Sequence, residues 1–315
     1  NYHKPDLVIV TRVLRASPDY PILKEAAIRK IPVVALVSSW DNFTTKGFFP
    51  FGVKKLVVWN QIMREEAEEL FGFPAKDIFI SGIPRFDNYF NLKDRRSKEV
   101  FFKAHDLDIR KKLITYATGN KSLLLSPGNK TSSEVDIAIE IASAITKGSI
   151  EDAQLLVRLH PLAEESDYAP LKNMKHVKIQ VPGEKNAFID RLFSEGDDRE
   201  LAETLIYSDV ILNVASTITI DSAIFDTPSI SVYYDPRGEL PLELSVKRIY
   251  EYEHYRKLRK TGGVNLVASP EEMIDQINEY IIKPSLNYDK RAAIIKQQCE
   301  YIDGRSGYRV ANFIL

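Results

Sequence analysis

The sequence has few of the features that would assign it to a disulfide-rich, membrane or nucleic-acid-binding class. It contains one cysteine, Cys299, in 315 residues, so it can form neither an internal disulfide nor a cysteine-rich metal site. No apolar run approaches the ~20 residues of a membrane-spanning helix. The 43 Lys and Arg residues balance 44 Asp and Glu residues, which leaves no overall basic charge to attract nucleic acid. We therefore expect a globular, cytoplasmic protein with no nucleic-acid partner.

Motifs that bind metal ions are missing as well. The sequence has no H-E-x-x-H motif and no paired cysteines. Asp106 and Asp108 form a D-x-D pattern, but they lie in an irregular stretch and are expected to be solvated charges. We expect no metal and no cofactor.

Alternating strand and helix patterns run through most of the chain. With 44% hydrophobic and 28% charged residues the chain can bury large cores, and its length exceeds the ~100–150 residues of a usual domain, so two domains are expected. The first ninety residues predict a helix at 19–30, a second that includes 65–70, and strands at 7–10, 33–37, 55–58 and 78–80. From residue 122 the predicted strands are 122–125, 154–159, 177–181, 210–213, 229–233 and 264–267. The predicted helices there are 133–146, 199–207, 217–226, 270–282 and 288–302. Such alternation is typical of parallel sheets covered by helices.

The pattern also suggests where the domains end. We predict a Rossmann-like domain at 1–95, a linker at 96–120, a second Rossmann-like domain at 121–300 and a terminal helix within 301–315. The linker prediction depends on a charged stretch at 93–98 and on the loss of a sustained period after it. Only about four strands fit before the linker, whereas a doubly wound sheet usually has about five or more. The first domain is therefore expected to be incomplete.

Polar residues that follow the strands are the candidates for a ligand site, because open parallel sheets bind ligands beyond the carboxyl ends of their strands. The most specific segment is 208–228, where a strand ends at Asn213 and Ser216 and Thr217 open a helix. Backbone N–H groups at such a helix start could hold a phosphate. Asp221 lies one turn later on the same face, where it could accept the hydroxyls of a ribose. Alternatively, Ser216 is an ordinary helix cap and Asp221 a solvated residue.

This segment resembles the GT-B glycosyltransferases, together with the sequences Arg158-Leu159-His160-Pro161 and Gly82-Ile83-Pro84-Arg85-Phe86-Asp87. The resemblance is to the branch near the CDP-glycerol glycerophosphotransferases, with the UDP-N-acetylglucosamine 2-epimerases more distant. It covers the chain from about residue 5 to its end. It implies two facing nucleotide-fold domains, the donor held mainly by the second, and a terminal helix that crosses back onto the first. From the sequence alone, that last helix could also be a frayed tail.

The resemblance implies roles for the residues that follow the strands of the second domain. Ser216 and Thr217 would hold the donor phosphates, and Asp221 would bind the ribose, although many relatives have Glu at that position. Arg158 and His160 would neutralise the diphosphate or the leaving group, for which the planar Arg fork is well suited. As an alternative, His160 is a core histidine held by its neighbours.

A second loop of that domain could also approach a phosphate. Gly128, Asn129 and Lys130 precede the helix predicted at 133–146, and the glycine permits a close approach because it lacks a side chain. A simple turn explains these residues nearly as well.

The first domain offers fewer candidates. Asp41 follows a strand end and is our candidate general base for deprotonating an acceptor hydroxyl, although Asp-Asn is also ordinary turn chemistry. Lys46 and Arg85 could pair with an acidic acceptor or be surface charges. His254, close in sequence to Tyr252 and Tyr255, could close over the donor or simply pack.

These inferences lead to three functional hypotheses. The first is a metal-independent glycosyltransferase or glycerophosphotransferase that moves a sugar or polyol group from a CDP-, UDP- or CMP-linked donor to a surface polysaccharide. Its acceptor would be a glycan or lipid-linked, and the protein could touch the inner face of the membrane. The second is a non-hydrolysing UDP-GlcNAc 2-epimerase. The third is a nucleotide-binding module without activity of its own.

Overall fold

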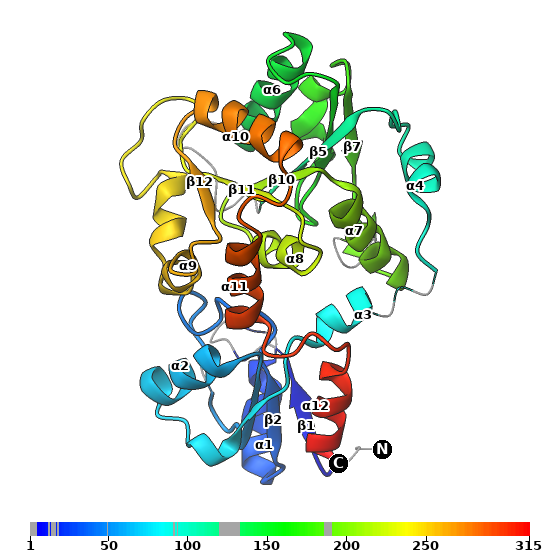
Figure 1. Cartoon of the computed structure of the whole chain (residues 1–315). Helices are drawn as coiled ribbons and strands as arrows, with labels where there is room; N and C mark the ends of the chain where they lie inside the picture. Colours follow the sequence, from blue (N-terminus) through cyan, green and yellow to red (C-terminus); the bar gives the residue numbers. More distant parts are fainter. Residues whose placement is uncertain are drawn as a thin grey trace. The chain divides into compact units, whose positions relative to one another are not determined.

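The computed structural model describes residues 5–11, 13, 17, 19–48, 50–90, 92, 94–119, 133–185 and 191–315. The chain forms two compact units, each built around a parallel sheet with helices (Figure 1). Unit 1 comprises Asn1–Asn91, Tyr252–Lys257 and Ile295–Leu315, and unit 2 comprises Leu92–Glu251 and Leu258–Ile294. This confirms the predicted fold class of two Rossmann-like α/β domains.

Unit 1 contains a sheet of four parallel strands in the order β1-β2-β3-β4. Its strands are β1 (Val8–Val10), β2 (Val33–Leu36), β3 (Lys55–Val58) and β4 (Ile78–Ile80). Its helices are α1 (Tyr20–Arg29), α2 (Gln61–Phe71), α3 (Asp87–Phe90), α12 (Ser306–Ile314) and the 3-10 turns η1 (Ala75–Asp77) and η2 (Pro84–Phe86). The strands lie at the positions that the short β-branched runs predict.

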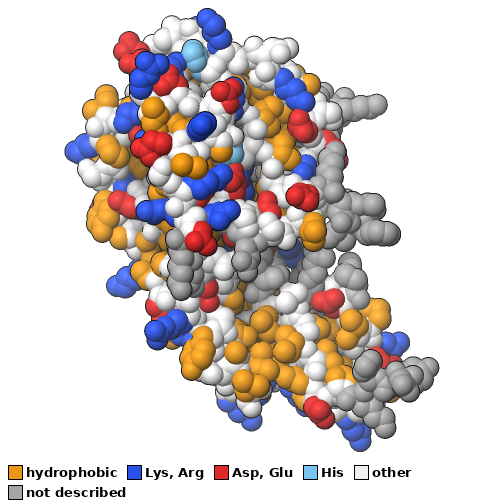
Figure 2. All heavy atoms as spheres, turned by 90° about the vertical axis from the view of Figure 1, so that its right-hand side faces the viewer, with side chains coloured by type: hydrophobic (Ala, Val, Ile, Leu, Met, Phe, Trp, Pro, Cys, Tyr) orange, Lys and Arg blue, Asp and Glu red, His pale blue; other side chains and the backbone are white. Residues whose placement is uncertain are grey.

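The terminal helix α12 packs on the sheet of unit 1. Val310 is buried against Val34 and Val57, and Phe313 stacks on Phe79 with ring centroids 4.4 Å apart. Val310 and Phe313 are three residues apart in sequence, the spacing that places apolar side chains on one helical face. The segment is therefore a packed helix and not a frayed tail. Figure 2 shows further hydrophobic side chains on the side of unit 1 that carries α12 and β1.

The Gly82–Asp87 turn holds the start of this helix. The Asp87 carboxylate accepts the backbone N–H groups of Ser306 and Gly307, at 2.9 and 2.7 Å. Gly82 has a φ of 82°, and a Cβ there would lie 2.6 Å from Ser306 Oγ. A carboxylate that satisfies two free amides at a helix N-terminus stabilises that helix. Part of the motif that carries the family resemblance is thus a structural anchor for α12.

We expect Asp87→Ala to destabilise unit 1 by about 1–2 kcal/mol, the usual cost of losing a helix cap. The measurement is the free energy of unfolding in urea. Glu25→Ala provides the control, because the Glu25 carboxylate pairs with Arg29 on the exposed surface of α1 in the same unit and its loss should change stability little. Equal stability of Asp87→Ala and the unmodified chain would contradict the anchoring role.

Unit 2 contains a sheet of six parallel strands in the order β12-β11-β10-β5-β6-β7. These are β5 (Lys112–Ala117), β6 (Ala153–Arg158), β7 (Val177–Gln180), β10 (Val210–Asn213), β11 (Ser229–Val232) and β12 (Asn265–Val267), and a separate hairpin pairs β8 (Glu184–Lys185) with β9 (Arg191–Leu192). The helices are α4 (Lys98–Ala104), α6 (Ser133–Thr146), α7 (Glu195–Tyr207), α8 (Ile218–Ile224), α10 (Pro270–Ile282) and the 3-10 turns η3 (Glu165–Leu171) and η4 (Val246–Glu251). Helices α9 (Glu253–Arg259) and α11 (Tyr288–Gln298) each carry residues of both units. Helices α6 and α10 contact one face of the sheet and α7 and α8 the other (Figure 1).

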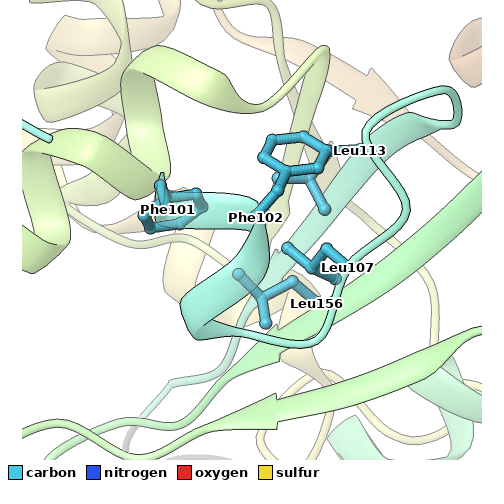
Figure 3. Packing of buried hydrophobic residues seen from close by; sticks show 5 residues of the cluster. All are labelled: Phe101, Phe102, Leu107, Leu113 and Leu156. Atoms are coloured by element: carbon cyan, nitrogen blue, oxygen red, sulfur yellow. The ribbon is translucent and has the colours of Figure 1, made fainter. Parts of the chain in front are cut away.

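The segment 96–120, predicted to be a linker, is part of the core of unit 2. It supplies α4 and β5, and β5 lies between β10 and β6 in the middle of the sheet. Figure 3 shows how side chains of this segment pack on one another and on β6, in a cluster of Phe101, Phe102, Leu107, Leu113 and Leu156. The linker prediction was therefore wrong. The predicted strand 122–125 lies outside the described residues.

The sequence pattern does not predict strand β5, because polar side chains interrupt its run of apolar residues. Thr115 and Tyr116 point to opposite faces of the sheet, since side chains alternate along a strand. The Thr115 hydroxyl lies 2.7 Å from that of Ser208, and the Tyr116 hydroxyl donates to Glu134. Each polar group is thus satisfied inside the core by a residue that is distant in sequence.

Candidate functional site

The strand order of unit 2 indicates where a ligand would bind. We number the six strands of its sheet along the chain, so that β5 is first and β10 is fourth. Their order across the sheet is then 6-5-4-1-2-3, which is the doubly wound order 3-2-1-4-5-6 viewed from the other edge. The direction of winding changes between these two strands, and open α/β sheets bind ligands beyond the carboxyl ends of the strands at such a change. The residues that follow β5, β10 and the neighbouring β6 therefore form the candidate site.

The end of β5 is fixed by a buried carboxylate. Glu134, at the start of α6, accepts the backbone N–H of Gly119 at 2.6 Å and the hydroxyl of Tyr116 at 3.2 Å. Its side chain is 1% exposed, and burial raises its pKa to about 7, although the Gly119 and Tyr116 hydrogen bonds act in the opposite direction. Glu134 thus fixes Gly119, directly before the segment 120–132. The predicted phosphate loop of Gly128, Asn129 and Lys130 lies in that segment, outside the described residues, and stays a prediction.

Glu134→Gln is expected to change how stability depends on pH. The pKa of Glu134 lies above its usual 4.5, so the folded state keeps its proton where the unfolded chain has lost it. This contribution to stability is complete below about pH 4.5 and is lost as the pH rises through about 7. At about 1.4 kcal/mol per pKa unit, the unmodified chain should lose about 3 kcal/mol of unfolding free energy between pH 4.5 and 8 relative to the variant. Urea unfolding across that range measures the difference, and parallel pH profiles would contradict the assignment.

His160, after β6, lies at the same end of the sheet. Its backbone N–H donates to Thr118 Oγ1 at 2.8 Å, which joins the ends of β5 and β6. Its Nδ1 accepts the backbone N–H of Leu162 at 3.1 Å, so a neutral ring carries its proton on Nε2. In its neutral form the half-buried imidazole therefore has its N–H group at Nε2.

Arg158 is engaged inside the sheet. It is the last residue of β6 and pairs in register with Gln180 of β7, and its Nη1 donates to Gln180 Oε1 at 2.5 Å. Gln180 in turn donates to Glu200 and Thr204 of α7. The buried guanidinium thus belongs to a polar network beneath α7, and it would have to leave Gln180 to reach a phosphate.

The turn between β10 and α8 is held by side chains. The N–H of Ala215 donates to Tyr250 Oη at 2.9 Å, the N–H of Ser216 to Asn213 Oδ1 at 3.0 Å, and the N–H of Ile218 to Ser216 Oγ at 3.3 Å. The sequence predicts that amides of this turn hold a phosphate, whereas these three are engaged within the protein. The contact of Ser216 Oγ is also that of a capping hydroxyl, as in the alternative interpretation.

The three predicted donor-binding residues of this turn differ in exposure. Ser216 and Thr217 are half-buried, and their contact with donor phosphates stays a prediction. Asp221 is 1% exposed, hence it is not the solvated residue of the alternative interpretation. A contact of Asp221 with a ribose stays a prediction, and it requires the carboxylate to become accessible.

In unit 1, Asp41 lies in the turn after β2, next to Lys46. Its Oδ2 is 3.0 Å from Lys46 Nζ, whereas its Oδ1 is buried without a hydrogen-bond partner in the part of the chain that the structure describes. The carboxylate accepts no described backbone N–H, and the turn is closed instead by the Asp41 carbonyl, which accepts from the Thr45 N–H. Asp41 is therefore not the cap of its own turn.

His254 is packed near Asp41. Its ring is 8% exposed, its Nδ1 lies 2.8 Å from Thr44 Oγ1, and its centroid is 4.8 Å from that of Trp40. Burial lowers its pKa to about 4, against the opposing charge of Asp41. His254 is therefore a packed residue with a neutral ring, as the second of the two interpretations of the sequence predicts. Arg85 by contrast is exposed and lies over the Phe86 ring, and its contact with an acceptor stays a prediction.

Metal ligands are not gathered in the described structure. Among its residues no three His, Cys, Asp or Glu side chains form a group suited to a metal ion. Asp106 and Asp108 pair with Lys178 and Arg110 at the surface. Among the same described residues no helix is long and apolar enough to span a bilayer.

Sequence reasoning missed two residues of this site. The sequence pattern places Glu134 in the helix predicted at 133–146, but it does not indicate that the Glu134 side chain is buried. Tyr250 lies in the long connection after β11, where no period predicts its position, and its contact with Ala215 joins residues 35 apart.

Comparisons with known proteins agree with this architecture. Residues 37–315 match the family model described as CDP-Glycerol:Poly(glycerophosphate) glycerophosphotransferase. The teichoic acid poly(ribitol-phosphate) polymerase of Bacillus spizizenii is 20% identical over 313 residues, which are 94% of this chain and 45% of that protein. The chain thus spans less than half the length of this relative.

Several solved structures share the fold. The UDP-GlcNAc 2-epimerase of Neisseria meningitidis bound to UDP-GlcNAc aligns with a TM-score of 0.65 at 15% identity, over 98% of this chain and 76% of that one. The wall teichoic acid polymerase TagF aligns with a TM-score of 0.58 at 17% identity, over 87% and 59%.

Proposed function

This chain belongs to the family of CDP-glycerol:poly(glycerophosphate) glycerophosphotransferases, and from that premise we propose that it transfers a polyol phosphate from a nucleotide-linked donor to a wall or surface polymer. The observation that carries the proposal is the extent of the family match, which covers β3, β4 and every strand of unit 2. A TagF variant was soaked with CDPG, which supports a CDP-linked donor here. UDP- and CMP-linked donors, and a sugar as the transferred group, are the other forms of the same hypothesis.

With CDP-glycerol as donor, the proposed reaction is a phosphoryl transfer. A hydroxyl oxygen of the acceptor attacks the phosphorus that carries glycerol, and a new P–O bond forms. The bond from that phosphorus to the bridging oxygen breaks, and CMP leaves with the electron pair. The acceptor proton passes to a base.

The geometry supports different roles for the candidate residues. Because His160 Nδ1 is occupied by the Leu162 N–H, neutral His160 would donate from Nε2 to the leaving phosphate and would not accept a proton. The base must then be another group, and our candidate is Asp41, whose buried Oδ1 has no hydrogen-bond partner among the described residues. The hydroxyls of Ser216 and Thr217 would bind donor phosphates. No metal is assigned a step.

The proposal is tested by mixing the chain with CDP-glycerol and a glycerol phosphate polymer and measuring CMP release. Release that depends on the acceptor and persists in EDTA supports the proposal, whereas loss on chelation contradicts metal independence. A thermal-shift screen of CDP, UDP, CMP and GDP identifies the nucleotide, because a ligand raises apparent stability by mass action.

The epimerase hypothesis has one observation in its favour, the fold shared with the Neisseria enzyme. Conversion of UDP-GlcNAc to UDP-ManNAc without an acceptor would decide for it. Nucleotide binding with neither activity would identify this chain as a binding module.

A further inference from the structure

Tyr250 bridges the ends of two strands with a single hydroxyl. The side chain, on η4, is fully buried. Its hydroxyl donates to the carbonyl of Val232, the last residue of β11, at 2.8 Å, and accepts the backbone N–H of Ala215, after β10, at 2.9 Å. The ring packs edge-on against Tyr233, with centroids 5.3 Å apart. Both the donor and one acceptor site of the hydroxyl are therefore used to tie two backbone segments together.

The backbone that Tyr250 holds is unusual. Ala215 has a φ of 42°, in the left-handed region that costs a residue with a Cβ roughly 1–2 kcal/mol. Such a conformation persists only where its surroundings impose it. Two side chains do so here, since Asn213 accepts the N–H of Ser216 and Tyr250 accepts the N–H of Ala215.

The conformation of Ala215 decides where the next residues lie. Ser216 and Thr217 follow it directly, and they are the half-buried hydroxyl residues of the candidate donor site. A change of φ at Ala215 to an ordinary negative value would rotate the chain that follows and move both hydroxyls. Tyr250 has no need to touch the donor to control this.

We propose that Tyr250 is a positioning residue for donor binding, because its hydroxyl holds Ala215 in the left-handed conformation that presents Ser216 and Thr217. The inference rests on the proposed function, since it takes those two residues to contact the donor. It adds a residue from a different part of the chain to that site.

The first test compares two Tyr→Phe variants of the 315-residue chain. Tyr250→Phe removes the hydroxyl that holds Ala215. Tyr280→Phe is the matched control. Tyr280 lies on α10 and is also buried, and its hydroxyl accepts a hydrogen bond from Asn287 in the turn after α10. We expect Tyr250→Phe to raise the Kd for CDP-glycerol, measured by calorimetry, by roughly tenfold, the factor that corresponds to one hydrogen bond. We expect Tyr280→Phe to leave that Kd unchanged, even where both variants lose similar stability in urea.

The second test uses glycine to separate positioning from general stability. Glycine adopts positive φ without a side-chain penalty, so Ala215→Gly in the Tyr250→Phe background should recover most of the lost donor affinity. In steady-state assays the donor KM should rise in Tyr250→Phe and fall again in the Tyr250→Phe/Ala215→Gly variant, while the acceptor KM stays constant. A purely structural role of Tyr250 predicts no recovery.

The outcomes separate the two proposals. If the unmodified chain binds CDP-glycerol and folded Tyr250→Phe binds it equally well, the positioning role is overturned and the proposed function stands. Failure of Ala215→Gly to restore affinity overturns the claim that Tyr250 acts through Ala215. If the unmodified chain binds none of CDP-glycerol, CDP and UDP, the proposed function falls and the donor role of Tyr250 falls with it.

Discussion

Asp41→Asn is expected to lower the rate of CMP release by about 10²–10⁴-fold, the range that a positioned general base contributes. Asparagine keeps the size of the side chain and can still accept from Lys46, but it cannot take a proton from the acceptor hydroxyl. The pairing of Oδ2 with Lys46 leaves Oδ1 buried without a described partner. We assign the proton to this oxygen, which must become accessible to the acceptor hydroxyl.

Lys46→Met is the control for this experiment. If Asp41 served only to hold Lys46, both variants would lose the same activity, because both break the same ion pair. If Asp41 is the base, Lys46→Met should keep most of the turnover. A turnover in Asp41→Asn above a tenth of the original rate would contradict the assignment.

Arg96→Met is expected to destabilise unit 2 by about 3–5 kcal/mol, because it leaves a buried charge without its partner. Glu203 is fully buried, and it accepts the Arg96 backbone N–H at 2.7 Å and the Arg96 Nε–H at 2.6 Å. Arg96 also pairs with Glu200. Burial acts to raise the pKa of Glu200, but the hydrogen bond and charge of His105, with the charge of Arg96, hold it at about 2.

The matched control is Arg110→Met, since Arg110 pairs with Asp108 at the surface and exposed pairs contribute little. Urea unfolding measures both variants. The double variant Arg96→Met/Glu203→Leu should recover stability, because removing both partners of a buried pair also removes the desolvation cost. A stability loss for Arg96→Met no larger than that for Arg110→Met would contradict the account.

The sequence predicts well those elements in which a single pattern is uninterrupted. β10 and α8 were found because an apolar strand ends in Asn213 and small hydroxyl residues follow. β5 was missed, since Thr115 and Tyr116 are polar and their partners are distant in sequence. Patterns of hydrophobicity identify a buried strand only where all of its side chains that enter the core are apolar.

The sequence predicts which residues follow the strands of the candidate site, but not the directions in which their side chains point. Arg158 was expected to face a ligand, yet it pairs with Gln180 beneath α7. Both faces of a central parallel strand are buried, so the sequence contains no polar alternation that would reveal which way its last side chain points. The burial of Asp221 and the contact of Tyr250 with Ala215 depend likewise on packing between distant segments.

The way the polypeptide passes between the units limits how the protein can be divided. It changes unit after Asn91, Glu251, Lys257 and Ile294, so neither unit is one uninterrupted stretch. A gene fragment that stops at residue 91 would lack α12, whose Val310 and Phe313 cover the sheet there, and would expose that apolar face to aggregation. Dissection of this protein should therefore use circularly permuted or rejoined segments.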